Sequence, residues 1–130
     1  DVIINNEGQK HFIYKDKKNI FTTPAFNFDE VSELPKNAIL LSSDKVNNVM
    51  GVIFEVGNSE IIGLQYHPDY EYFQMLNLIA GRKERLFKNK NFLSEEEYQS
   101  HIKYINSQNE LLDFNSRTCE VRNWLNYIKN

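Results

Sequence analysis

Two strand-like runs separated by a short polar connection dominate the middle of the chain. Residues 49–56 (VMGVIFEV) and 60–67 (EIIGLQYH) are rich in β-branched and aromatic side chains. Gly57, Asn58 and Ser59 join them, and a short Gly/Asn connection of this kind is typical of a β-hairpin. The pattern therefore predicts two neighbouring antiparallel strands, and any fold of the chain must contain a sheet built around them.

Further strands are expected before this hairpin. Residues 38–43 (AILLSS) form a continuous apolar run of the buried-strand type, introduced by the turn signal Pro35-Lys36-Asn37. Residues 11–14 (HFIY) form a shorter apolar run that is followed by the polar turn KDKKN. The first half of the chain is thus predicted to consist of strands and turns.

The apolar pattern changes to a helical period after residue 70. Residues 70–82 (YEYFQMLNLIAGR) place Phe73, Leu76 and Ala80 on one stripe, and Gly81 suits the end of a helix. The second helical run, residues 94–108, begins with Ser94 and has Glu97 at capping-box spacing. Between these two runs, the polar residues 82–91 are expected to form a surface loop.

The remaining apolar positions complete the prediction of an α/β domain. In the run 94–108, Tyr98, Ile102 and Ile105 share one face. A last helix, with Asn115 or Ser116 as its cap, is expected to turn its apolar face to the core; that face comprises Val121, Trp124, Leu125 and Ile128. The sequence therefore predicts a single domain over residues 1–130, with strands and a β-hairpin followed by three helices.

Composition narrows the function classes. The net charge of −3 implies no general affinity for nucleic acid or anionic membranes. No apolar run approaches the roughly 20 residues that span a bilayer. No signal peptide is visible and the chain has one cysteine, so a reducing cytoplasm is the expected compartment. The first residue is Asp1, which favours the interpretation that the sequence is a piece of a longer polypeptide.

The step His67-Pro68-Asp69 carries the strongest chemical signal. A histidine at the C-terminal end of a strand lies where open α/β sheets build their sites. Pro68 restricts His67 to extended dihedrals, and Asp69 is near enough to accept a hydrogen bond from the imidazole. Such a carboxylate orients a histidine that takes up and releases protons. Taken alone, a His-Pro step at a strand end is more commonly only a turn.

The surrounding residues resemble a known family. The segment GLQYHPD (63–69) resembles the G-V-Q-F/Y-H-P-E segment of class I glutamine amidotransferases, which release ammonia from glutamine with a Cys-His-Glu triad. Residues 28–44 and 50–69 resemble the stretches that precede and deliver this histidine. The tail LLDFNSRTCEVRNWLNYI is similar to that of proteins related to the GMP synthase amidotransferase domain. The resemblance implies that the chain is the C-terminal portion of a flavodoxin-like amidotransferase domain.

The roles that the resemblance implies fall on two residues. His67 matches the histidine that activates the cysteine and then protonates the departing ammonia. Asp69 matches the acid that orients it, although the family usually has Glu there, and the shorter side chain withdraws the carboxylate by roughly 1.5 Å. Glu71 is an alternative acid, but an exposed carboxylate at a helix start is its simpler interpretation. Asn27 stands where the family often has a non-catalytic histidine.

The family's nucleophile has no counterpart in these residues. It belongs on a glycine-flanked strand-to-helix elbow upstream of the histidine, whereas Cys119 follows His67 and lies in a predicted helix. The helical period places Cys119 nearly opposite the apolar stripe, so we expect a peripheral cysteine without a catalytic role. The three histidines share no metal-ligand spacing, and neither a metal nor a cofactor is expected.

Three functions remain open. The first is a glutaminase whose cysteine lies on an upstream segment, with glutamine as substrate and a synthetase domain or subunit as the acceptor of ammonia. The second is a catalytically inactive binding or regulatory domain, which the replacement of Glu by Asp69 and the absent nucleophile favour. The third is a γ-glutamyl peptide hydrolase that uses the same triad. Substrate-binding residues are not identifiable, and the chain alone is not expected to be active.

Overall fold

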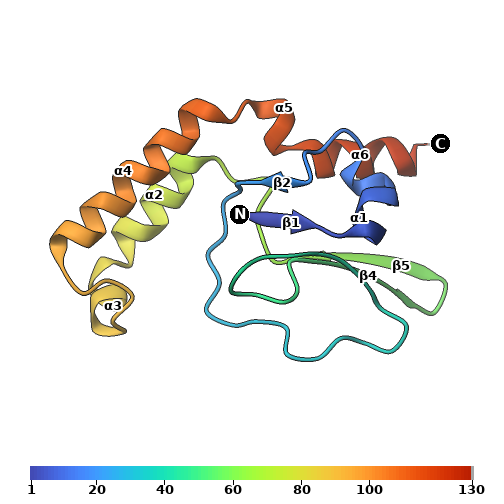
Figure 1. The fold of residues 1–130 in the computed structure, drawn as a ribbon, viewed down its shortest axis with the longest axis horizontal. Coiled ribbons are helices and arrows are strands. Elements are labelled where there is room, and N and C mark those ends of the chain that lie inside the picture. The colour runs from blue at the N-terminus through green and yellow to red at the C-terminus, as the bar shows by residue number, and fades with distance from the viewer. Residues whose placement is uncertain (130) are drawn as a thin grey trace. The chain divides into compact units, whose positions relative to one another are not determined.

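The computed structural model describes residues 1–129, and they divide into two compact units. The first unit comprises residues 1–69 together with the C-terminal residues from 115 onward, and the second comprises residues 70–114. Strands precede helices along most of the chain, as expected of a mixed α/β protein. Figure 1 shows the order of the elements. No helix within residues 1–129 is long and apolar enough to cross a membrane.

The first unit is built on a five-stranded sheet with the order β2-β1-β3-β4-β5. The strands are β1 (Val2–Ile4), β2 (Ile20–Phe21), β3 (Ile39–Ser43), β4 (Gly51–Val56) and β5 (Ser59–Leu64). All neighbouring pairs in this sheet are antiparallel. The predicted hairpin is confirmed, since β4 and β5 pair from Gly51↔Leu64 to Val56↔Ser59. Gly57 turns the chain with φ of +62°, a conformation that glycine adopts readily.

Two short helical elements occupy the N-terminal region that was predicted to contain only strands and turns. Helix α1 (Asn6–Lys10) precedes the 3₁₀-helix η1 (Phe12–Tyr14), so the expected strand at residues 11–14 is wrong. The Asn5 side chain accepts the Gly8 N–H at 2.8 Å and donates to the Leu40 carbonyl at 2.7 Å. A Cβ atom on Gly8 would overlap the Leu41 carbonyl oxygen. Contacts with β3, rather than local periodicity, therefore determine α1.

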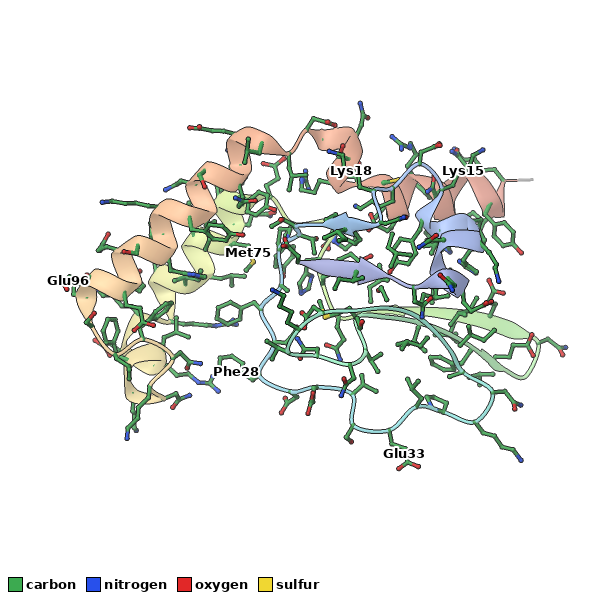
Figure 2. The ribbon with its side chains drawn as sticks, in the orientation of Figure 1. Lys15, Lys18, Phe28, Glu33, Met75 and Glu96 are labelled. Atoms are coloured by element: carbon green, nitrogen blue, oxygen red, sulfur yellow. The ribbon has the colours of Figure 1, made fainter. Side chains whose placement is uncertain are left out.

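The core of the first unit lies against this sheet. Its buried residues come from η1, the strands β1 to β4, the residue before β4 and the loop after β5: Val2, Ile4, Ile13, Tyr14, Phe21, Leu41, Met50, Ile53 and Tyr66. The long connection between β2 and β3 lies outside this core. Phe28 and Glu33 project from it in Figure 2, and both are exposed.

The second unit is a helical hairpin in which α2 (Tyr72–Gly81) and α4 (Glu95–Leu111) lie side by side (Figure 1). The end of α2 at Gly81 is confirmed, but its predicted stripe is wrong by one position. Its buried residues are Tyr72, Met75 and Ile79, and Phe73 is exposed. A one-residue shift of this kind turns a helix by about 100°.

Helix α4 agrees better with its pattern. Tyr98 and Ile105 are buried, and the Ser94 hydroxyl accepts the Glu97 N–H at 3.1 Å as an N-cap. Glu96 lies on the outward side of its first turn (Figure 2). The loop expected at residues 82–91 instead contains α3 (Lys83–Lys88), because Leu86 is buried there.

The C-terminal helix buries a different face from the one predicted. Helix α5 (Phe114–Arg117) contains both proposed caps, and α6 (Cys119–Ile128) follows it. Cys119 and Glu120 are buried, whereas Trp124, Leu125 and Ile128 are 40–56% exposed. The Asn123 side chain donates to the carbonyls of Ile13 and Lys15 at 3.0 and 2.8 Å. The side of α6 that carries Cys119 and Asn123 therefore packs against η1. Helices α2, α4 and α6 correspond to the three predicted, and α1, α3 and α5 are additional.

Candidate functional site

His67 lies in the loop that follows β5. The prediction that the strand extends to His67 is wrong, because β5 ends at Leu64. The Gln65 N–H still donates to the Met50 carbonyl at 2.9 Å, and the chain then leaves the sheet. The His67 N–H donates instead to the Pro24 carbonyl at 2.8 Å. This bond attaches the histidine loop to the segment that follows β2.

The structure brings the two predicted catalytic residues into contact. Nδ1 of His67 lies 3.4 Å from Oδ1 of Asp69, and the side chains are 38% and 63% exposed. Charge-assisted N–H···O bonds are commonly about 2.7–2.9 Å long, so this contact is loose. An exposed pair of this length contributes little to stability. The carboxylate lies on the Nδ1 side of the imidazole, where an acid can select the tautomer of a histidine.

Asn27 holds the backbone on the N-terminal side of the histidine. Its Nδ2 donates to the Gln65 carbonyl at 2.5 Å. At the position where class I glutamine amidotransferases often have histidine, the Asn27 side chain of this chain therefore anchors the loop. The departure at Asn27 is local and leaves the His67–Asp69 contact in place.

Tyr66 anchors the loop from inside the core. Its hydroxyl lies 2.8 Å from Oε1 of Glu120 and 3.1 Å from the Tyr14 hydroxyl, and its ring is 2% exposed. Glu120 Oε2 in turn accepts a hydrogen bond from Lys17 at 2.9 Å. Burial raises the pKa of Tyr66 far above its usual value, and the neighbouring Tyr14 and the Glu120 carboxylate raise it further. Tyr66 thus stays a neutral hydrogen-bond donor.

The C-terminal side of the histidine is held by Arg117. Its Nη1 donates to the Pro68 carbonyl at 3.1 Å, and its side chain is buried. Sequence reasoning singled out neither Arg117 nor Glu120. Both residues are charged and lie in the tail RTCEVRNW, which was the available signal in the sequence. A helical period alone, however, does not tell which face of a helix is buried.

Glu71, the alternative acid, is exposed and stands at the start of α2 in the second unit. Its N–H donates to the Gln74 side chain at 2.7 Å, one arm of a capping box. Asp69 is the acid that lies beside the imidazole.

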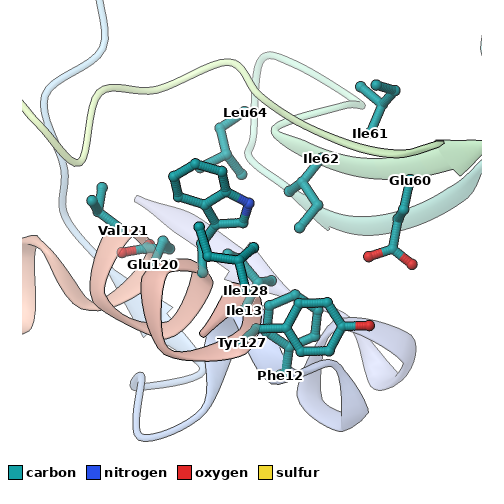
Figure 3. A pocket seen from close by; sticks show the side chains of 11 residues that line it. Phe12, Ile13, Glu60, Ile61, Ile62, Leu64, Glu120, Val121, Tyr127 and Ile128 are labelled. Atoms are coloured by element: carbon teal, nitrogen blue, oxygen red, sulfur yellow. The ribbon is translucent and has the colours of Figure 1, made fainter. Parts of the chain in front are cut away.

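Two cavities in the first unit lie near this loop but do not include the pair. The larger, about 520 Å³, is bounded by α6, η1 and β5, and Tyr127 stacks on Phe12 at its edge (Figure 3). Its lining is predominantly apolar, with Glu60 as an exposed acid. The smaller, about 430 Å³, reaches Gln65. Neither lining contains His67 or Asp69, so the larger cavity lacks the groups expected for hydrolysis.

Cys119 is unsuited to act as the nucleophile. It is 1% exposed, which corrects the expectation of a peripheral cysteine, and its thiol donates to the Lys15 carbonyl at 3.1 Å. Asn123 Nδ2 lies 3.4 Å from the same sulfur. A thiol enclosed by its own fold does not reach a substrate. Among residues 1–129, no three His, Cys, Asp or Glu side chains group in a way that would hold a metal ion.

Comparison with known proteins gives one informative similarity. The chain is 23% identical over 147 aligned positions to a γ-glutamyl-L-1-hydroxyisopropylamide hydrolase from Pseudomonas sp.. The alignment covers 98% of this chain and 48% of that protein, so the chain spans about half the length of the curated relative it matches. No protein-family profile and no solved structure matches the chain.

Proposed function

We propose that this chain supplies the histidine and the acid of an enzyme that hydrolyses γ-glutamyl amides through a cysteine thioester. The observation that carries the proposal is the His67–Asp69 contact in a loop held by Pro24, Tyr66 and Arg117. The similarity to a γ-glutamyl amide hydrolase, which covers 98% of this chain and 48% of that protein, also supports it.

The proposed reaction uses His67 twice. His67 takes the proton of a cysteine thiol, and the thiolate attacks the γ-carbonyl carbon of the substrate. The C–N bond then breaks, His67 gives its proton to the departing amine, and a γ-glutamyl thioester remains. Water, deprotonated by His67, hydrolyses the thioester to glutamate and regenerates the thiol. Asp69 orients the imidazole and stabilises its charged form.

We place the nucleophile on a segment outside these 130 residues. Cys119 is the chain's one cysteine and is buried, and the curated relative is about twice as long as the aligned part. The sheet of residues 1–129 is antiparallel throughout. In our proposal, the parallel strands and cysteine elbow of a flavodoxin-like domain belong to that other segment.

The proposal leaves two candidate substrates, which differ in their leaving group. The name of the Pseudomonas relative favours an amide of a small alkylamine. The segment GLQYHPD favours glutamine, with ammonia passed to a synthetase domain or subunit. Both reactions cleave the same γ-glutamyl C–N bond. They differ only in the leaving group that takes the proton from His67, which is an alkylamine in the first reaction and ammonia in the second.

Glutamate release by the full-length gene product that contains this chain tests the proposal. Glutamine and γ-glutamylisopropylamide are compared as substrates, and hydroxylamine is added to trap a thioester as γ-glutamyl hydroxamate. We expect turnover of at least one substrate and formation of the hydroxamate. Glutamate release without hydroxamate would contradict the covalent route, and no release from either substrate would contradict the function.

A further inference from the structure

The tail segment Arg117–Glu120 (RTCE) places two charged side chains inside the first unit. Arg117 is 8% exposed and Glu120 is 1% exposed. Arginine and glutamate are almost never fully buried unless they are paired, because removing a charge from water is costly. The contacts that offset this cost therefore indicate what the two side chains do.

Both side chains contact the neighbours of His67. Arg117 Nη1 donates to the carbonyl of Pro68, the residue after the histidine, across 49 positions of sequence. Glu120 Oε1 accepts the hydroxyl of Tyr66, the residue before it, across 54 positions. Figure 1 shows α5 and α6 following one another at the C-terminal end of the chain, so one short segment supplies both contacts.

We propose that Arg117 and Glu120 are positioning residues that hold His67 from both sides in its working orientation. This inference rests on the proposed function, because it assigns these residues to the same site. The backbone of His67 is held by Pro24. Arg117 holds the peptide unit after Pro68, and Glu120 holds the side chain of Tyr66, the residue before the histidine.

The Pro68 carbonyl is the sensitive point of this arrangement. It lies in the peptide unit between Pro68 and Asp69, so its rotation displaces the Asp69 carboxylate. The Nδ1–Oδ1 distance is already 3.4 Å, and further separation would break the contact. A misplacement of about 1 Å in a catalytic geometry costs about 100-fold in rate. Arg117 is therefore expected to affect catalysis without touching the substrate.

Asn123, on the same helix as Glu120, provides a matched control. Its side chain also donates to distant backbone carbonyls, those of Ile13 and Lys15, but it contacts no residue of the histidine loop in those bonds. Asn123→Ala should thus lower stability through α6 without acting on His67. Arg117→Lys keeps the charge and a donor, whereas Arg117→Met removes both.

The first measurement needs no activity. NMR spectra of the full-length gene product report the ring signals of His67 in each variant, with Tyr66→Phe as a milder change that removes one hydroxyl. Arg117→Met and Tyr66→Phe are expected to shift and broaden these signals, and Asn123→Ala is expected to leave them unchanged. Unchanged His67 signals in a folded Arg117→Met or Tyr66→Phe chain overturn the inference. If Arg117→Met does not fold, the Tyr66→Phe spectrum decides.

The second measurement separates this inference from the proposed function. In the full-length gene product, Arg117→Met should lower kcat about 10- to 100-fold with little change in KM, and Arg117→Lys should restore part of it. If His67→Ala abolishes turnover while Arg117→Met behaves like Asn123→Ala, the positioning role is wrong and the function stands. If His67→Ala leaves turnover intact, the proposed function fails, and the NMR result alone decides whether the tail holds the loop.

Discussion

The buried ion pair of Lys17 and Glu120 yields the most quantitative prediction about the fold. Their charged atoms lie 2.9 Å apart, and the side chains are 6% and 1% exposed. Lys17 also donates to the Ser116 carbonyl at 2.7 Å and lies over the Phe21 ring. Glu120→Ala leaves the lysine charge buried without its counterion.

The expected cost follows from this burial. Removing one partner of a buried pair destabilises by about 3–5 kcal/mol, since the remaining charge stays desolvated. The free energy of unfolding of a domain of this size is about 5–15 kcal/mol in total. The melting temperature should then fall by about 10–20 °C. Unfolding by urea, followed by the fluorescence of the single tryptophan, Trp124, reports on the first unit.

An exposed pair in the same unit provides the control. Lys10 and Glu7 lie 2.8 Å apart, nearly the same distance, but are 71% and 56% exposed. Glu7→Ala should therefore cost under about 1 kcal/mol. The double variant Lys17→Met/Glu120→Gln removes both charges and should recover most of the loss. A Glu120→Ala cost no larger than that of Glu7→Ala would refute the reasoning.

Two further predictions concern stability. Gly8→Ala should destabilise the protein by at least about 2 kcal/mol, because its Cβ would overlap the Leu41 carbonyl. Gly81→Ala has open space around it and should be neutral or stabilise by up to about 1 kcal/mol. Thermal melts compare the two variants, and equal effects would contradict the packing of α1. Partial burial lowers the pKa of His101 from its ordinary value of 6.5 by more than the nearby Glu97 raises it. The stabilising contribution of His101 is therefore complete above pH 6.5 and is lost as pH falls through the lowered folded value. His101→Gln should flatten the rise in unfolding free energy between pH 5 and 7, and an unchanged slope would contradict this.

The parts of the fold that local chemistry determines were predictable. The hairpin follows from two strand-like runs and the glycine turn at Gly57, and α4 follows from Ser94 and its apolar period. The parts that depend on distant contacts were not. Helix α1 packs against β3. In α6, Cys119 and Glu120 face inward and contact partners that lie 104 and 54 residues away in the sequence.

One part of the candidate site was likewise predictable from the sequence, and another part was not. The step His67-Pro68-Asp69 was recognisable because its three residues are consecutive, although the end of its strand was misplaced. Arg117 was not recognisable, since its contact with Pro68 spans 49 residues and a helical period does not reveal which face is covered.

The rate of γ-glutamyl amide hydrolysis by the His67→Gln variant of the full-length gene product tests the central claim most directly. General acid–base catalysis by a positioned histidine contributes about 10²- to 10⁴-fold, so kcat should fall by that factor. His101→Gln, a histidine of the second unit, should retain the rate of the unmodified protein. A His67→Gln rate within a factor of about two of the unmodified protein, far below the loss expected for a proton-transferring histidine, would contradict the account.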